Sequence, residues 1–199
     1  MAESLLLVRH GQTIANKKGR WHGDTDGPLT WRGKRQAKRT ARTLVARGHE
    51  FEALYVSPLT RCQMTAAPSA KALGLQASIA QDLREWSIGE WEDMPFSLLA
   101  SEHNFMNRVR EDPEFTPPGG ESLLMVAGRL VPALQRINAA HEGPVLVVSH
   151  GACLSVALAH LLDQDIRQWP HYLFDNCGLT ELVFEPQPYV NYFNRTEHL

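Results

Sequence analysis

The chain has 199 residues and a formal net charge of −2, with 43% hydrophobic and 21% charged residues. This length fits one domain with or without an insertion, so we expect a single domain over residues 1–199. The near-neutral charge disfavours nucleic acid as a partner. No apolar run approaches the roughly 20 residues that span a membrane, so a membrane partner is not expected either. The N-terminus does not resemble a signal peptide, and widely spaced cysteines, odd in number, fit a reduced, cytoplasmic compartment.

A short apolar run near the N-terminus ends abruptly in polar residues. Residues 5–8 predict a strand buried on both faces. An arginine, a histidine and a glycine stand where this strand stops: Arg9, His10 and Gly11. The pattern recurs downstream, where an apolar run over 144–149 leads into His150 and Gly151. Because ligands bind beyond the carboxyl ends of strands in open α/β sheets, we predict one pocket built from both ends of the chain.

The polar segment 12–29 is too long for a passive connector and is expected to be a binding loop. Thr30 would cap the helix that follows, and Gly48 would end it. The predicted inner face of this helix consists of Ala37, Ala41, Leu44 and Val45. Half of all Lys and Arg residues fall between residues 17 and 47. They form either a solvated helix face or an attractor for anionic substrates, and both interpretations stay open.

Residues 52–56 read as a second strand, followed by a helix. Ser57 and Pro58 are predicted as the N-cap and first residue of that helix. This places Arg61 in the first turn, the end of a helix that favours anions. Pro68 is expected to kink or split the helix.

The second half of the chain alternates between strand and helix patterns. Residues 76–81 predict a weaker strand that leads to Glu85, and residues at about 86–120 predict an irregular helical lid over the pocket. Trp86, Trp91 and Cys153 are expected in the core. The remaining elements are a helix over 121–140 bent at Pro132, a strand over 144–149, a helix over 151–162 and two closing strands over 178–184 and 189–193. This alternation predicts a mainly parallel sheet with helices on both faces.

Several familiar catalytic sites do not fit the sequence. A serine-hydrolase elbow needs glycine two residues before Ser149, where Val147 stands. No cysteine is followed six residues later by the arginine of a cysteine phosphatase, and neither a phosphate-binding G-x-x-x-x-G-K-[ST] loop nor G-x-G-x-x-G occurs. A metal at the strand ends is not expected, because Arg9 beside His10 would repel a cation and few carboxylates or thiolates accompany them.

What remains is a pocket for an anion, formed by two arginines, two histidines and a helix N-terminus. Guanidinium groups such as those of Arg9 and Arg61 match phosphate oxygens. Their charges lower the pKa of an imidazole, so either His10 or His150 would be neutral and nucleophilic near pH 7. Glu85, at another strand end, could protonate the leaving alkoxide. These groups predict phosphoryl transfer through a phosphohistidine.

Motifs in this order resemble the histidine phosphatase (phosphoglycerate mutase-like) superfamily: LLLVRHGQT, GDTDGPLTWRGKRQA, SPLTRCQMTA, LREWSIGEWED, PPGGES and VLVVSHGACL. The tail FNRTEHL is similar to the end of its broad-specificity phosphatase branch. The resemblance implies a three-layer α/β fold, with a six-stranded, mostly parallel sheet, one antiparallel strand, helices on both faces and a small helical lid. It also implies that no metal or other cofactor is used.

The resemblance further assigns roles to individual residues. It implies that His10 is the nucleophile and that Glu85 protonates the leaving group and later activates water. Arg9, Arg61 and His150 would hold the phosphoryl group. Further phosphate or substrate contacts are implied for Thr13, Asn16, His22, Gly23 and Gly151. Asp82, Glu90 and Glu92 remain rival carboxylates for Glu85, and the other histidines (49, 103, 141, 160, 171 and 198) are expected to be structural or exposed.

Two departures from relatives bear on the substrate. His22 stands where many relatives of the phosphatase branch carry glutamine, which favours a different leaving group. The chain also lacks the long insertion of the mutases, so we expect a phosphoric monoester hydrolase that acts on a small-molecule phosphate ester. A phosphoglycerate mutase and a non-catalytic module that binds phosphorylated ligands are the alternatives.

Overall fold

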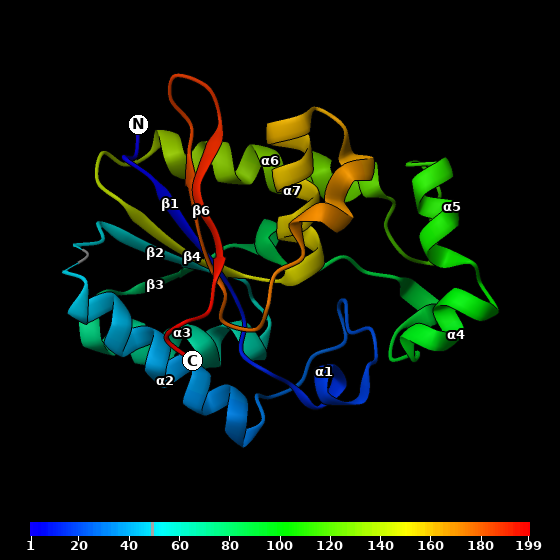
Figure 1. Cartoon of the computed structure of the whole chain (residues 1–199), viewed down its shortest axis with the longest axis horizontal. Coiled ribbons are helices and arrows are strands. Elements are labelled where there is room, and N and C mark those ends of the chain that lie inside the picture. The colour runs from blue at the N-terminus through cyan, green and yellow to red at the C-terminus, as the bar shows by residue number, and fades with distance from the viewer. Residues whose placement is uncertain (49) are drawn as a thin grey trace.

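A single mixed sheet organises the computed structural model, which describes residues 1–48 and 50–199 (Figure 1). In these residues six strands lie in the order β3-β2-β4-β1-β5-β6. Their bounds are β1 Leu5–Arg9, β2 Ala53–Val56, β3 Ala77–Ile79, β4 Val145–Ser149, β5 Leu179–Val183 and β6 Tyr189–Arg195. The first four in this order pair in parallel, and β5 runs antiparallel to both of its neighbours. The predicted mostly parallel sheet with one antiparallel strand is therefore confirmed.

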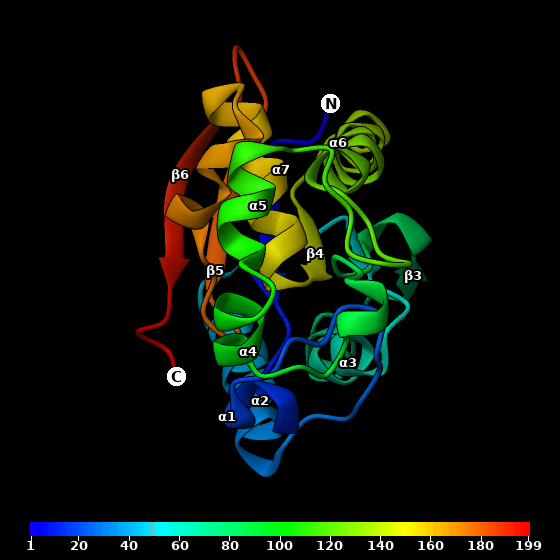
Figure 2. The same ribbon diagram turned by 90° about the vertical axis from the view of Figure 1, so that its right-hand side faces the viewer.

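Helices cover both faces of the sheet. Figure 2 shows α6 and α7 above and α2 and α3 below. The α-helices are α1 Ile14–Lys18, α2 Trp31–Ala46, α3 Thr60–Leu73, α4 Phe96–Ser101, α5 Phe105–Glu111, α6 Leu123–Ala139 and α7 Gly151–Asp163, and short 3₁₀ helices are η1 Gln81–Leu83, η2 Gly89–Trp91 and η3 Ile166–Tyr172. Within the described ranges, no helix has both the length and the apolar character needed to cross a bilayer.

Strand β1 is apolar at every position because its two faces belong to two separate cores. Leu5 and Leu7 pack in a cluster with α6 and α7, whereas Leu6 and Val8 pack in a second cluster with residues of α2 and α3. Successive side chains of a strand point to opposite faces, so a strand covered on both sides needs a continuous apolar run. This arrangement holds the end of β1, and the histidine that follows it, in the centre of the molecule.

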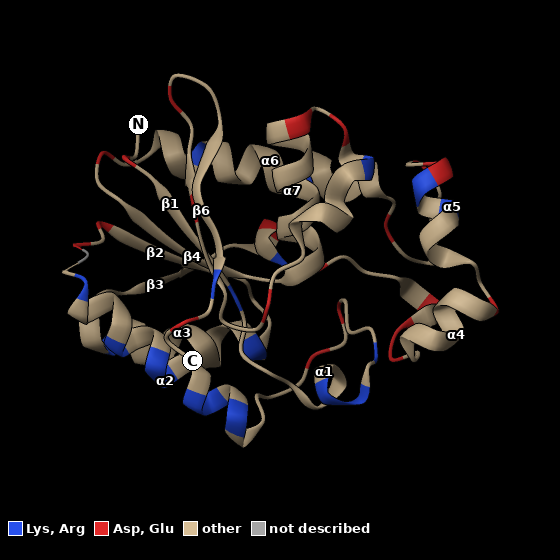
Figure 3. Ribbon diagram, in the orientation of Figure 1, with Lys and Arg blue, Asp and Glu red and all other residues tan. Residues whose placement is uncertain are grey.

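Some local expectations were wrong. Helix α3 begins at Thr60 with Leu59 as its N-cap, not at Pro58 after a Ser57 cap. Pro68 does not split it, since both halves pack against α2 and the sheet and a proline removes only one backbone hydrogen bond. Val45 is 49% exposed and does not belong to the inner face of α2. Basic residues recur along α2, as Figure 3 shows, and its lysines and arginines from Arg32 to Arg42 are all exposed.

The segment 86–120 carries η2, α4 and α5 and lies beside the sheet rather than in it (Figures 1 and 2). Aromatic rings attach it to the binding loop: Trp21 meets Trp86 edge-on at 5.4 Å between centroids and Phe105 at 5.6 Å. Trp86, Trp91 and Cys153 are buried, which confirms them as core residues. The segment thus forms a helical unit in direct contact with residues 12–29.

The contact between the loop that follows β1 and the start of α2 yields a stability prediction. A Cβ added to Gly33 would lie 2.2 Å from the carbonyl oxygen of Gln12, and this neighbour is backbone that cannot rotate away. We expect Gly33→Ala to lower the free energy of unfolding by about 1–3 kcal/mol, because forced overpacking shifts the backbone. Thermal unfolding would show this as a Tm lower by roughly 2–10 °C.

Gly27→Ala provides the matched control, since a Cβ at Gly27 has no heavy atom within 4 Å. Its Tm should stay close to that of the unmodified protein. Equal melting temperatures for the two variants would contradict the close approach of Gln12 and Gly33.

Candidate active site

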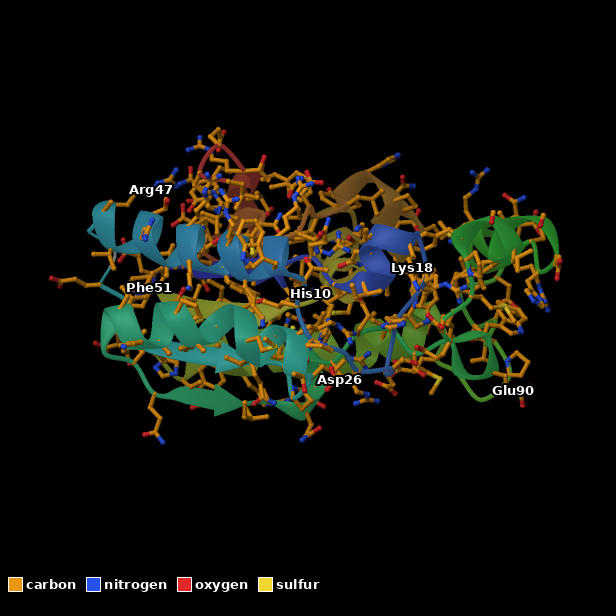
Figure 4. All side chains as sticks on the ribbon, turned by 90° about the horizontal axis from the view of Figure 1, so that it is seen from below. His10, Lys18, Asp26, Arg47, Phe51 and Glu90 are labelled. Atoms are coloured by element: carbon orange, nitrogen blue, oxygen red, sulfur yellow. The ribbon has the colours of Figure 1, made fainter. Side chains whose placement is uncertain are left out.

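The two strand-end histidines lie together because their strands are neighbours. β1 pairs with β4 so that Arg9 stands opposite Ser149, and the His10 N–H donates to the Ser149 carbonyl at 2.9 Å. The imidazole rings of His10 and His150 are 5.2 Å apart between centroids, at an interplanar angle of 63°. Figure 4 labels His10 in the middle of the molecule. The pair of His-Gly motifs therefore does converge on one place.

His10 is held as a neutral imidazole with one free nitrogen. Its ring is buried, and Nδ1 lies 2.8 Å from the Gly11 carbonyl oxygen. A carbonyl can only accept, so Nδ1 carries the proton and Nε2 keeps its lone pair. Burial, followed by the charges of Arg9 and Arg61, holds the pKa of His10 well below its usual value. The ring therefore presents a nucleophilic Nε2 at neutral pH.

His150 is also neutral, but both of its nitrogens have partners. The Arg61 Nε–H donates to Nδ1 at 3.2 Å, so Nε2 carries the proton and lies 2.6 Å from the Ser57 hydroxyl oxygen. Burial lowers the pKa of His150 well below its usual value, and the charge of Arg61 adds to this. Ser57 is a site residue that the sequence analysis missed, since it was interpreted as a helix cap. Its position directly after β2, another strand that ends at this edge, was the available signal.

Arg61 connects His150 to the binding loop. Its side chain is fully buried, and a guanidinium has five N–H donors. Besides His150, these donors reach the carbonyl oxygens of Thr25 at 2.8 Å, Gly23 at 2.7 Å and His22 at 3.2 Å. The backbone of residues 22–25 is thereby wrapped around one buried cation. Asp26 faces the same group, with Oδ1 3.8 Å from Nη1.

Arg9 carries an unsatisfied donor beside the N-terminus of α7. Its Nη1 donates to the Phe174 carbonyl, but Nε is buried and has no hydrogen-bond partner among the described residues. Burial lowers the pKa of Arg9, and the charge of Glu85 opposes that shift. A Cβ at Gly151 would lie 3.0 Å from Nε, so glycine lets the first turn of α7 approach this cation. An unpaired buried donor beside a helix N-terminus is the environment that an anion satisfies.

Glu85 also caps the N-terminus of α7. Its Oε1 accepts from the backbone N–H groups of Cys153 at 2.7 Å and Trp86 at 2.9 Å, and Oε2 accepts from Ala152 at 3.1 Å. The side chain is buried, and the Arg129 guanidinium donates to the Glu85 carbonyl at 2.9 Å. The carboxyl group therefore has a fixed orientation, with fewer partners on Oε2 than on Oε1.

The three carboxylates that the sequence left as alternatives to Glu85 either bind other groups or lie exposed on the surface. Glu92 accepts from the backbone N–H groups of Gly23 at 2.8 Å and Ile88 at 3.0 Å, so it ties the binding loop to the lid segment. Asp82 pairs with Arg136 at 2.7 Å on the surface, and Glu90 is exposed. Of the carboxylates considered from the sequence, Glu85 is the one that the structure places against α7 next to Arg9.

The polar groups of Thr13 and Asn16 are already engaged in hydrogen bonds within the protein. Thr13 caps α1, and the Asn16 Oδ1 accepts from the Thr13 N–H at 3.1 Å. Asn176, which the sequence analysis missed, donates from Nδ2 to Asn16 Oδ1 at 3.1 Å and to the His10 carbonyl at 3.0 Å. Asn176 precedes β5, and because β5 is antiparallel its beginning meets the edge where β1 ends. Only the carboxyl ends of strands were considered from the sequence.

The remaining histidines lie in other environments. His103 stacks on Trp91 at 4.1 Å between centroids, and His141 lies between Tyr55 and Glu52. Three more complete the described set: His160 and His171 are exposed, and His198 contacts Thr40. His49 lies outside the described residues. No group of three His, Cys, Asp or Glu side chains suited to a metal was found in residues 1–48 and 50–199.

Comparison with known proteins defines the family. The model of the histidine phosphatase superfamily (branch 1) matches residues 5–194, and the chain belongs to this superfamily. It is 38% identical over 199 residues to a bifunctional protein of Mycobacterium tuberculosis, an alignment that covers 98% of this chain. The same alignment covers 54% of that protein, so the chain spans about half the length of this relative.

Two further relatives are phosphatases by name. A glucosyl-3-phosphoglycerate phosphatase of Mycobacterium tuberculosis is 31% identical over 180 residues, which covers 85% of this chain and 79% of that protein. The crystal structure of a phosphoserine phosphatase from Entamoeba histolytica in complex with 3-phosphoglyceric acid has a TM-score of 0.88 at 28% identity, covering 98% of each chain. This likeness also confirms the fold class predicted from the motifs.

The two neutral buried histidines predict how stability depends on pH. Below about pH 6.5 the unfolded chain protonates both, whereas their lowered pKa values keep them neutral in the folded state. The unfolded state then binds more protons, so stability falls as the pH drops below about 6.5, by up to about 1.4 kcal/mol per pH unit for each histidine. Urea unfolding at pH 7.5 and 5.5 measures this difference. The loss should be smaller in His150→Asn, and equal losses in the two proteins would contradict the neutral assignment of His150.

Proposed function

We propose that this protein hydrolyses small phosphate monoesters through a covalent phosphohistidine on His10, without a metal ion. The observation that carries the proposal is the Nδ1–H bond of His10 to the Gly11 carbonyl, which leaves Nε2 unprotonated. Arg9, whose charge acts on His10, keeps an unpaired Nε–H. The names of the relatives support a phosphate ester as substrate. Hydrolysis is preferred to mutase transfer because the chain lacks the long insertion expected of the mutases.

In the first step the phosphoryl group is transferred to the enzyme. The Nε–H of Arg9, an N–H of Arg61 and the N-terminus of α7 at Gly151 bind the phosphoryl oxygens and stabilise charge that develops on them. The lone pair of His10 Nε2 attacks phosphorus, and the bond from phosphorus to the ester oxygen breaks. Glu85, protonated on Oε2, gives its proton to the departing oxygen, so that an alcohol leaves.

In the second step water replaces the histidine. The carboxylate of Glu85 takes a proton from water as the water oxygen attacks phosphorus, and the bond from phosphorus to Nε2 breaks. His10 returns to its neutral form, Glu85 is again protonated and inorganic phosphate is released. Thr13, Asn16 and His150 contribute by fixing the positions of the loop and of Arg61 around this centre.

The nucleophile is tested with His10→Ala in the presence of a chelator. We expect hydrolysis of p-nitrophenyl phosphate to fall by at least about 10³-fold, because no other group would form the covalent intermediate. Brief exposure to a ³²P-labelled ester followed by an alkaline quench should leave label on the unmodified protein and none on the variant. His160→Asn, an exposed histidine of α7, is the matched control and should retain both signals.

Undiminished turnover by His10→Ala, or a protein that never carries label, would rule out the phosphohistidine. Activity that is lost in the chelator and restored by a divalent metal would rule out the metal-independent route. Faster interconversion of 2- and 3-phosphoglycerate than release of phosphate would favour the mutase.

The role of Glu85 is tested by the leaving group. In Glu85→Gln we expect kcat/KM for an alkyl phosphate to fall by about 10²–10⁴-fold, since an alkoxide needs a proton to leave. The loss for p-nitrophenyl phosphate should be much smaller, because p-nitrophenolate is stable without one. Glu90→Gln, at an exposed carboxylate of the same segment, is the control. Equal losses for both esters would show that Glu85 is not the proton donor.

A further inference from the structure

We propose that the groove between α2 and α3 is a docking site for an acidic amphipathic helix of a partner protein. The two helices lie side by side below the sheet (Figure 1). The groove between them has a volume of about 1000 Å³, and none of the described residues that line it belongs to the candidate active site. The inference goes beyond the proposed function and does not depend on it.

Every described residue that lines the groove has either an apolar or a cationic side chain. The apolar ones are mainly alanines, together with larger side chains such as Val45 of α2 and Met64 of α3. Val45 is exposed, although Ala41 and Leu44 on the same helix are buried. The apolar face of α2 therefore extends beyond its contact with the core and onto the surface. A hollow apolar surface accompanied by polar residues is typical of a site that binds a protein or a ligand.

The groove has the dimensions of a short helix. On α2 its lining residues recur every three to four positions from Lys34 to Ala46, and on α3 they do so from Met64 to Ala72, so each set lies on one helix face. At a rise of about 1.5 Å per residue, the α2 stripe is about 18 Å long, or about three helical turns. Two adjacent helices with such stripes form a groove into which the ridges of a third helix pack. Helices recognised in this way use apolar anchors at i, i+3 or i+4, and i+7.

Three cations of α2 form a row along the groove, and a fourth comes from α3. Lys34, Lys38 and Arg42 are exposed and spaced at i, i+4 and i+8, and Lys71 lines the groove from the other helix. Like charges four positions apart repel and destabilise a helix. Neither α2 nor α3 contains Asp or Glu, and none of the four cations has an ion-pair partner within residues 1–48 and 50–199. The carboxylates that neutralise this row are therefore those of a bound partner.

Other anions match only part of this surface. A fatty acid offers one carboxylate to four cations. A bilayer surface is flat at this scale and does not fill a groove between two helices. Single-stranded nucleic acid stacks its bases on aromatic side chains, and none of the described residues that line the groove is aromatic. A helix with leucines on one side and glutamates beside them fills the apolar part and pairs with the cations as well.

The test uses a synthetic, fluorescein-labelled peptide of about 15 residues, with leucines at i, i+3, i+7 and i+11 and glutamates beside them. Fluorescence anisotropy should give a Kd of about 1–100 µM at low salt, as for a small interface. The affinity should fall several-fold between about 0.05 M and about 0.5 M NaCl, because exposed charges are screened. A peptide of the same composition in scrambled order should bind at least about tenfold more weakly, and one with lysine in place of glutamate should not bind.

Variants on the two helices locate the site. Lys38→Glu should weaken binding of the acidic peptide by at least about tenfold, because an attraction becomes a repulsion. Arg39→Glu makes the same change of charge at an exposed residue of α2 that does not line the groove, and it should alter Kd by less than about threefold. Ala67→Gln narrows the groove without a change of charge and should weaken binding by about fivefold or more. All three positions are exposed, and circular dichroism checks that the variants fold. In ¹H–¹⁵N NMR spectra of the unmodified protein, the peptide should shift amide signals of both helices.

The remaining outcomes overturn the proposal. The first is no binding of the acidic peptide up to about 1 mM. Equal effects of Lys38→Glu and Arg39→Glu would mean general attraction to a basic helix, and amide shifts confined to other elements would place the peptide elsewhere. Vesicles of phosphatidylserine and phosphatidylcholine, a short DNA duplex and laurate enter the same assay as competitors. Tighter binding of any of these that Lys38→Glu abolishes would assign the groove to that ligand instead. Hydrolysis of p-nitrophenyl phosphate is measured separately, so failure here leaves the proposed function intact.

Discussion

A buried guanidinium, that of Arg61, joins the parts of the site that come from distant segments. It contacts His150 after β4 and the carbonyl oxygens of the loop at residues 22, 23 and 25. A buried charge is tolerated only where hydrogen bonds surround it, so the loop must close over Arg61 for the fold to be stable. The same closure connects the backbone of His22 and Gly23, through Arg61, to His150. The conformation of the loop at residues 22–25 and its position relative to His150 therefore both depend on the buried guanidinium of Arg61.

Burial, together with the charges of the two arginines, holds the pKa values of the two histidines well below the usual value. Arg9 and Arg61 lie near His10 and His150, and a protonated ring between them would add a further buried cation. The rings instead stay neutral and use one N–H each, toward the Gly11 carbonyl and the Ser57 hydroxyl. The unpaired Nε–H of Arg9 leaves the pocket with an excess of positive charge that a phosphate dianion would balance. In the proposed mechanism, anion binding and the nucleophilicity of His10 would thus both depend on one electrostatic arrangement.

The sequence was sufficient for the sheet and for the convergence of its strand ends. Strands buried on both faces are apolar throughout, so β1 and β4 could be predicted from the sequence. The convergence of their His-Gly motifs could be predicted as well, because parallel strands end at the same edge of a sheet. Residues whose importance depends on a tertiary contact could not be identified from the sequence. Ser57 was interpreted as a helix cap, but its hydroxyl contacts His150. Asn176 contacts the His10 carbonyl from the beginning of an antiparallel strand. Glu92 resembled a catalytic candidate, but its oxygens hold loop amides that no local pattern could indicate.

The position of Glu85 depends on a second layer of contacts that connects it to the lid. Arg129 of α6 pairs with Glu121 at 2.7 Å and donates to the carbonyl oxygens of residues 84 and 85. Glu121 in turn accepts from the Ser87 N–H, and its own carbonyl receives the indole N–H of Trp86. The backbone on both sides of Glu85 is thus fixed by one ion pair, which the burial of Arg129 and Glu121 shields from water. A proton donor, the role proposed for Glu85, must keep its carboxyl within hydrogen-bond reach of the leaving oxygen, and the contacts of helix α6 with the backbone of residues 84 and 85 add to those that α7 makes with the carboxyl group.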